Sequence, residues 1–429
     1  MFKVFQSKKC SRAGAFLFLF LFLFCLLPFS ILANEGFDFD EDLEEEAGFS
    51  LPLSLKLGLK NAQQISPRRA IFSGASFSPT LAYSLGDFLF HIEGDGFYNL
   101  AYRKEKDPSH IISQYEKEWV TRQAYASYVD GDKTLYLGKK IEIVGKNDIL
   151  SVLDVISPRD TTEALFAGPK QARLGQNLLR FSFGLWESEL SLYYSPKGAS
   201  HKSPEPGHPY APLALPRVES YTHREKEYYI SLSHTFGPFD WVFMGGSPHV
   251  RDPLLVLNEG ALRKEYHPYD MVGAGLTYTG FGVLFKMEAS HFTDYPLMAE
   301  TLEKHKGFGY ALGIDYFSQQ YGQFMVEAMG KRVDSYAGKS PEINTNQYAF
   351  SYQKGFMRDD LSVQFLLMGI ETAANLIGTL KVQYRFMENF ELAFSKSLLH
   401  IESKAYKELD DYDRYAFSLY WYLDMQKRK

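Results

Sequence analysis

Apolar residues alternate with polar or small ones along most of the chain, and no later run matches the apolar stretch near the N-terminus. The segment GFGYALGIDYF (307–317) places Phe308, Tyr310 and Leu312 on one face, opposite glycine, alanine and aspartate. A period of two predicts strands with two different faces. Many of these segments approach the 9 to 11 residues that a tilted strand needs to cross a bilayer.

The composition favours a barrel over a soluble sheet. Aromatic residues make up 16% of the chain, with 35 Phe and 29 Tyr, while the mean hydropathy is only −0.25. Transmembrane β-barrels combine alternating faces with aromatic residues at both membrane interfaces. A soluble β-sandwich is the alternative, but an apolar face recurs on every strand without an evident edge strand.

The first 33 residues are predicted to be a secretory signal peptide. A basic start, with Lys3, Lys8, Lys9 and Arg12, precedes an apolar run and then Pro28 and Ala33. That order is typical of a cleaved signal; an uncleaved membrane anchor is the alternative. Both cysteines lie inside this segment, so the mature chain has no disulfide.

Residues 34–49 are predicted to be an acidic periplasmic tail that carries eight acidic residues. With 46 basic residues, four of them in the signal, and 52 acidic ones, the mature chain has a formal charge of −10. No basic cluster is present, which excludes a nucleic-acid-binding role.

Connections of two lengths alternate along residues 50–429. Eight short turns lie near residues 86, 131, 187, 237, 280, 319, 359 and 388. Nine longer segments lie between them, at 60–76, 101–118, 142–175, 195–224, 247–267, 291–306, 331–345, 371–375 and 400–411. This pattern predicts an all-β transmembrane antiparallel barrel of 18 strands, or alternatively 16, with short periplasmic turns and long extracellular loops.

The face opposite the apolar one would line the lumen. The predicted lumen-wall residues are polar and of mixed sign: Glu93, Asp95, Arg180, Lys286, Glu288, Lys381 and Arg385. As a group they predict a hydrated interior. Each charge could also do no more than pair with a neighbour on the wall.

The strand LYLGKKIEIV (135–144) breaks this alternation, because strict alternation places Lys139 or Lys140 on the lipid side. A lysine near the bilayer midplane costs about 2–4 kcal/mol. The sequence therefore predicts a β-bulge near Gly138 that turns both lysines inward or toward a rim; Lys139 reaching the membrane interface is the alternative.

The segment 142–175 is too apolar for a solvated loop, since Ile149, Leu150, Val152, Leu153, Val155 and Ile156 are interleaved with its charges. A long loop of this kind must pack against something. We expect it to fold into the barrel and narrow the pore; a lid above the membrane is the alternative. The candidate constriction residues are Lys140, Glu142, Lys146, Asp148, Asp154, Arg159, Asp160 and Glu163.

The runs Leu137–Lys140, Gly145–Asp148 and Asp154–Asp160 (DVISPRD) resemble a signature of a porin-like family of Gram-negative outer-membrane barrels. That family carries a domain of unknown function (DUF1302) and is distantly akin to alginate-export barrels. Lys139 and Lys140 stand where the family has Arg-Gln, and Val144 stands where it has Trp. The resemblance implies an outer-membrane barrel and says little about the solute.

Other candidate sites are weaker. His201, His208 and His223 lack the short spacing of a metal site, and no cofactor is implied. The adjacent pairs Ser233-His234 and Ser290-His291 point to opposite faces of a strand, so the sequence predicts no enzyme.

The sequence therefore predicts a porin-like channel of the bacterial outer membrane for passive diffusion of small hydrophilic solutes. A non-conducting surface barrel, adhesive or structural, and a transporter of hydrophobic compounds are the alternatives. Expected partners are outer-membrane lipid, the solutes, and the barrel-assembly machinery, because the aromatic segment RYAFSLYWYL (414–423) resembles its recognition strands. The oligomeric state is left open.

Overall fold

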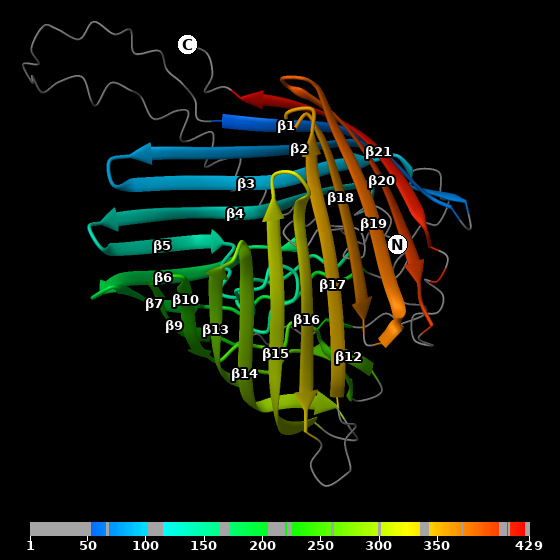
Figure 1. Ribbon diagram of the computed structural model, residues 1–429. Coiled ribbons are helices and arrows are strands. Elements are labelled where there is room, and N and C mark those ends of the chain that lie inside the picture. The colour runs from blue at the N-terminus through cyan, green and yellow to red at the C-terminus, as the bar shows by residue number, and fades with distance from the viewer. Residues whose placement is uncertain are drawn as a thin grey trace, which may run out of the picture. The chain divides into compact units, whose positions relative to one another are not determined.

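Eighteen antiparallel strands close into one barrel in the computed structural model (Figure 1). It describes residues 53–65, 68–101, 115–162, 172–204, 219–220, 225–258, 261–298, 302–334, 343–370, 372–402, 410 and 412–424. The barrel strands are β1 (Leu53–Gln64), β2 (Arg69–Leu85), β3 (Phe88–Asn99), β4 (Lys117–Asp130), β5 (Lys133–Lys140), β6 (Gln176–Leu185), β7 (Ser188–Ser195), β9 (Glu227–Phe236), β10 (Phe239–Gly246), β13 (Asp270–Gly280), β14 (Val283–Met298), β15 (Leu302–Ser318), β16 (Gly322–Val333), β17 (Ile343–Phe356), β18 (Leu361–Ile370), β19 (Thr372–Met387), β20 (Phe390–His400) and β21 (Arg414–Asp424).

Closure joins the first barrel strand to the last. β1 pairs with β21 over eleven residues, from Ser54 opposite Asp424 to Gln64 opposite Arg414. Every other barrel strand pairs with the barrel strands next to it in sequence, so the wall has no free edge. A closed wall satisfies its backbone hydrogen bonds internally, as a lipid environment requires. The predicted fold class and strand number are confirmed.

The two faces of the wall differ as the alternation predicts. From Phe308 to Tyr316 of β15 every second side chain is exposed and apolar, such as Leu312 and Ile314, whereas Ala311 and Gly313 between them are buried. On β14 the exposed Met287 lies between the buried Lys286 and Glu288. The exposed apolar face therefore suits lipid, and the polar face lines the interior.

All eight predicted short turns are present, but several predicted long loops are shorter. β1 and β2 leave only residues 65–68 between them, β14 and β15 leave 299–301, and β18 and β19 leave residue 371. The strands also reach into the predicted loop 331–345 from both ends, since β16 ends at Val333 and β17 begins at Ile343. These hairpins extend because backbone pairing continues through bulges, at Phe292/Tyr295 for example, where the side-chain alternation fails.

The predicted β-bulge near Gly138 is wrong. The register of β5 is continuous with β4 from Lys133 to Lys139 and with β6 from Lys133 to Lys140. Gly138 instead has a φ of 130°, which only glycine adopts readily, and β5 ends two residues later. The Lys139 ammonium donates to the carbonyl of Thr121 at 2.5 Å, and Lys140 donates to Glu142 at 2.6 Å.

A second, three-stranded sheet is separate from the barrel wall and consists of β8 (Glu219–Ser220), β11 (Leu254–Asn258) and β12 (Ala261–Glu265). Its strands belong to the connections β7–β9 and β10–β13. No helix within the described part of the chain is long and apolar enough to cross a membrane. The predicted signal peptide (1–33) and acidic tail (34–49) lie outside the described residues and stay predictions.

Substituting Leu312→Arg on the exposed face of β15 should destabilise the barrel in lipid by about 2–4 kcal/mol, because the charge would meet the hydrocarbon. Urea unfolding of the protein in bilayers measures this, with Leu312→Ala as the control for lost packing alone. Equal free energies of unfolding for the two variants would contradict the assignment of this face.

Candidate functional site

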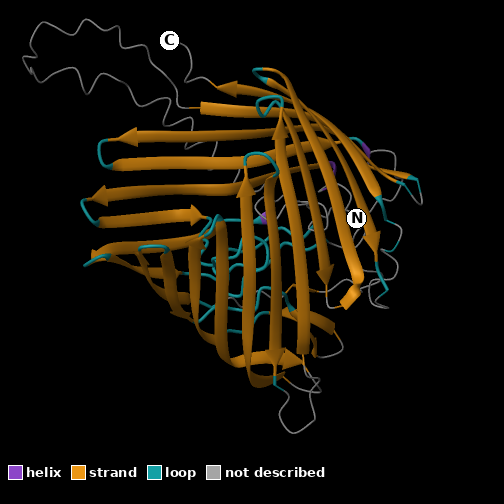
Figure 2. Ribbon diagram, viewed as in Figure 1, coloured by secondary structure: helices purple, strands orange, loops and turns teal. Residues whose placement is uncertain are grey.

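The connection between β5 and β6, of which residues 141–162 and 172–175 are described, is called the inner loop below. Its described residues lie against the interior side of the wall. Figure 2 shows loop segments in the space that the strands surround. Two wall carboxylates, Glu288 on β14 and Glu327 on β16, hold its first half. Both are nearly inaccessible to solvent.

Each carboxylate accepts several hydrogen bonds from the loop at 2.5–3.2 Å. Glu288 accepts the backbone N–H groups of Lys146, Asn147, Val152 and Leu153 and the hydroxyl of Ser151. Glu327 accepts the backbone N–H groups of Asp148, Ile149 and Leu150. Bonds to a charged acceptor are worth about 1.5–3 kcal/mol each. The backbone of the loop's first half is therefore anchored directly to the wall.

Glycines allow the inner loop to approach the inner face of the wall closely. A Cβ at Gly145 would lie 2.0 Å from Ser151 Oγ and 3.1 Å from Glu288 Oε1. On the wall, a Cβ at Gly273 would lie 2.4 Å from Leu153, and one at Gly313 would lie 2.4 Å from Asn147 Oδ1. The glycines on the inner face thus form a surface shaped to the loop.

The apolar residues of the inner loop are buried against the wall. Leu153 packs with side chains from β10, β13, β14 and β16. Ile156 packs with Leu178, Tyr193, Tyr229 and Met244 on β6, β7, β9 and β10. Ile149 and Leu150 pack against β17 at Ala349 and against neighbouring methionines. The loop therefore covers the inner face of much of the wall.

Lys286 on β14 lies among three carboxylates. Its ammonium is 2.5 Å from Asp148, 2.6 Å from Asp315 and 3.7 Å from Glu327. These three are the one group of acidic side chains within the described residues that is compact enough to hold a metal ion. The Lys286 ammonium already supplies the positive charge that such an ion would bring.

The predicted constriction residues are distributed over several ion pairs. Lys140 and Arg180 both contact Glu142, at 2.6 and 3.1 Å. Lys146 contacts Asp240 on β10 at 2.6 Å.

Farther along the loop, Asp154 accepts from Arg159 at 3.3 Å and from Arg173 at 2.8 Å. Asp160 lies 3.2 Å from Lys202, which also contacts Glu118. Glu163 lies outside the described residues.

The exposed fractions of these side chains differ. The side chains of Glu142 and Asp154 are 6% and 1% exposed, whereas Asp148 is 38% exposed. Arg159 and Asp160 are intermediate, at 28% and 25%. The first two residues therefore hold the loop together, and the other three are partly exposed to solvent.

The predicted lumen-wall residues all lie on the polar face. Arg122 on β4 contacts Glu93 and Asp95, each at 3.4 Å. Arg180, Lys286 and Glu288 contact the loop as described above. Lys381 and Arg385 on β19 alternate with exposed apolar side chains and lie away from the loop contacts.

Sequence reasoning missed a buried cluster that ties three connections together. Arg251, between β10 and β13, donates to the carbonyls of Val155 and Ile156 in the inner loop and to Ala199 in the β7–β9 connection. Its charge is paired with Glu227, which is fully buried. Both residues occur in polar stretches of the sequence, and only their burial in the structure distinguishes them from the charged residues around them.

His201 lies beside this cluster, and its Nδ1 accepts the backbone N–H of Arg159 at 2.9 Å. Burial lowers the pKa of His201 to about 4, and the nearby Arg251 and Arg159 act in the same direction against Asp252 and Asp154. The imidazole is therefore neutral at physiological pH, as an acceptor role requires.

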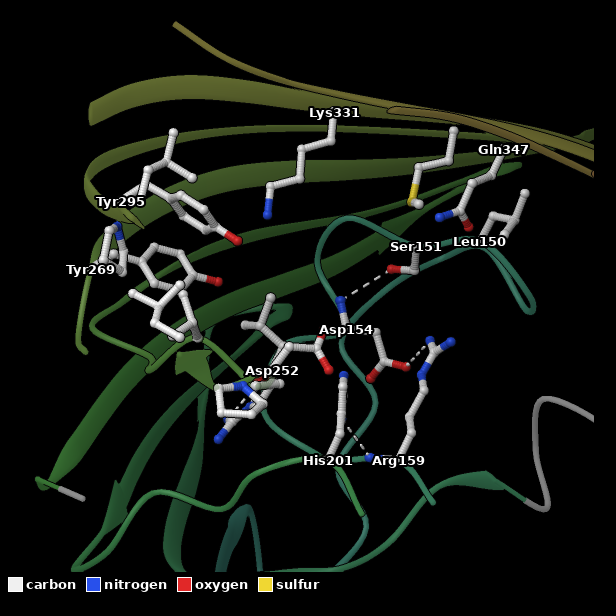
Figure 3. Close-up of a pocket in the computed structure, with 18 of the residues that line it drawn as sticks. Leu150, Ser151, Asp154, Arg159, His201, Asp252, Tyr269, Tyr295, Lys331 and Gln347 are labelled. Atoms are coloured by element: carbon white, nitrogen blue, oxygen red, sulfur yellow. Dashed lines mark hydrogen bonds and ion pairs between the residues drawn. The ribbon is translucent and has the colours of Figure 1, made fainter. Parts of the chain in front are cut away.

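A cavity of about 400 Å³ lies between the inner loop, the β10–β13 connection and the wall strands β14, β16 and β17 (Figure 3). Ser151, Asp154 and Arg159 of the inner loop reach it, as do Tyr295 and Lys331 of the wall.

Solved outer-membrane channels share this architecture. OccK8 (OprE) of Pseudomonas aeruginosa matches with a TM-score of 0.51 and 10% identity, over 87% of this chain and 98% of its own. The fold is that of the outer-membrane porins. OccK2 (OpdF) of the same organism, solved in complex with glucuronate, matches at 0.50 and 9% over 87% and 96%; OccAB3 of Acinetobacter baumannii matches at 0.50 and 9% over 86% and 98%.

At these identities the likeness shows the fold alone, and together with the barrel it supports an outer-membrane location. The sequence matches no protein-family model and no curated protein. The resemblance to the DUF1302 family and to alginate-export barrels is therefore without support.

Substituting Glu327→Gln should loosen the inner loop, because the amide places an N–H₂ donor against backbone donors. We expect about 1.5–3 kcal/mol of lost local stability, measured as faster hydrogen exchange at the amides of residues 148–150. Glu391→Gln is the matched control, since that wall carboxylate accepts from Gln383 on its own sheet. Unchanged exchange in Glu327→Gln would contradict the anchoring role.

The inner loop should also loosen in acid. The pKa of His201 falls from 6.5 when unfolded to about 4 when folded, so its contribution is complete above pH 6.5 and is lost as the pH falls toward 4. The protection of the Arg159 amide against hydrogen exchange, relative to an unfolded chain at the same pH, measures this between pH 7 and pH 4. His201→Asn keeps an acceptor and should remove the pH dependence; the same pH dependence in that variant would contradict the prediction.

Proposed function

We propose that the protein is a porin-like channel that lets small hydrophilic solutes diffuse passively across the bacterial outer membrane. The observation that carries this proposal is a closed barrel whose inner face is polar and whose inner loop is anchored to that face. The porin fold of the structural neighbours supports it, and the glucuronate bound to OccK2 is a solute of this size and polarity.

The inner loop is proposed to narrow the lumen and to select solutes by charge. Asp148, Arg159 and Asp160 are the constriction residues that water reaches, and they carry both signs. A mixed set of charges in a narrow lumen acts on the charge and orientation of a solute as well as on its size. Lys140, Glu142, Lys146 and Asp154 would support these residues through their ion pairs.

A transporter of hydrophobic compounds is less well supported, because buried charges such as Lys286 and Glu288 lie on the inner face. A non-conducting surface barrel would share the fold and differ only in transport. The predicted cleaved signal peptide and recognition by the barrel-assembly machinery belong to this proposal, and no catalytic step does.

Planar-bilayer recording of the refolded protein tests the function. The wild-type protein should form open channels, and deletion of residues 144–167 should raise the single-channel conductance because the loop occupies part of the lumen. A matched control shortens the three-stranded sheet by removing residues 257–262. Absence of channels from a correctly folded barrel would refute the function; unchanged conductance in the deletion variant would refute the role of the loop.

A further inference from the structure

The cavity beside the inner loop contains a lysine, Lys331, that makes no ion pair with any described residue. The Lys331 ammonium lies 4.0 Å from the ring centre of Tyr295 and 5.1 Å from that of Phe292. Among the described residues, no carboxylate lies within ion-pair distance of it. In Figure 3 the ammonium points into the cavity, and the hydroxyls of Tyr269 and Tyr295 lie on the same side.

A negative charge without a partner faces the same space. Asp252, on the β10–β13 connection, lines the cavity and is exposed. It makes no ion pair or hydrogen bond within the described part of the chain. Figure 3 shows Lys331 on the wall and Asp252 on the opposite, loop-bearing side.

The other charges at this cavity are already paired. Arg159 is bound to Asp154, and Arg251 is bound to Glu227. His201 is a neutral acceptor. Among the described residues that line the cavity, Lys331 and Asp252 are therefore the two charged side chains without an ion-pair partner.

The same cavity is also lined by apolar side chains that include Leu254, Leu297 and Met329. Its volume of about 400 Å³ falls within the usual range of small-molecule sites. An apolar group can be buried there while charged groups at its end reach polar partners, which is how such sites commonly fix orientation.

We propose that this cavity binds small zwitterions with an apolar body, such as α-amino acids with aliphatic side chains. The carboxylate of the solute would bind Lys331 with the two tyrosine hydroxyls, and its ammonium would bind Asp252. A simple anion would leave Asp252 facing a like charge, and a simple cation would do the same to Lys331. This assignment rests on the proposed function and names a solute class for the channel.

Three probes of matched shape separate the possibilities: leucine, 4-methylpentanoate, which lacks the ammonium, and 3-methylbutylamine, which lacks the carboxylate. Titration calorimetry of the refolded protein in detergent should show leucine binding more tightly than either analogue. Each lost charge-assisted contact should weaken binding by about tenfold.

Two variants assign the contacts. Lys331→Gln should lower the affinity for leucine by about tenfold and raise that for 3-methylbutylamine, whose ammonium then no longer faces a like charge. Asp252→Asn should lower the affinity for leucine to the same degree and raise that for 4-methylpentanoate for the same reason. The matched controls are Lys304→Gln and Asp294→Asn, an exposed pair 3.4 Å apart on the β14–β15 hairpin, and circular dichroism verifies that each variant is folded.

Two results would overturn the proposal. Equal affinity for leucine and 4-methylpentanoate, with no effect of Asp252→Asn, would make the site an anion site. Absence of a heat of binding with all three probes would show that the cavity is not a binding site for them. Because calorimetry needs no ion flow, channels that conduct without binding leucine refute this inference alone, whereas leucine binding to a non-conducting barrel refutes only the channel function.

Discussion

The hydrogen bonds from the inner loop to Glu288 and Glu327 are the interaction on which the interior of this barrel depends. Eight donors of one loop converge on two carboxylates that the wall strands place at fixed positions. A backbone N–H buried without an acceptor is strongly unfavourable, so the loop and the two glutamates stabilise one another. The positions of the charged side chains follow from this anchoring.

The inner wall is complementary to the loop in shape as well as in charge. Gly273 and Gly313 leave room where the loop packs most closely, and the apolar side chains of β10, β13 and β16 cover Leu153. Arg251, paired with Glu227, links the β7–β9 and β10–β13 connections to the inner loop. The lumen therefore contains a packed, hydrogen-bonded assembly whose solvent-reaching charges are few.

Particular residues show how far the sequence could be interpreted. Alternation along 307–317 was sufficient to predict β15 and its faces, because side chains of a strand must point to opposite sides. The same reasoning failed at Gly138, where a positive φ replaces the predicted bulge, and at 291–306, where pairing continues although alternation does not. Glu327 was overlooked although it alternates with apolar neighbours, and Arg251 has no local pattern that distinguishes it.

The sequence by itself predicted a barrel of 18 strands, with 16 as the alternative, and a polar interior, since period, turn residues and strand length are local properties. It also pointed to residues 142–175, whose apolar residues are unsuited to solvent. Only the tertiary structure decided which wall residues hold that segment, which charges are paired, and that Lys331 and Asp252 face one cavity. Many of those relations join residues about 80 to 180 positions apart, and contacts at such separations depend on strand register and closure, which no local pattern encodes.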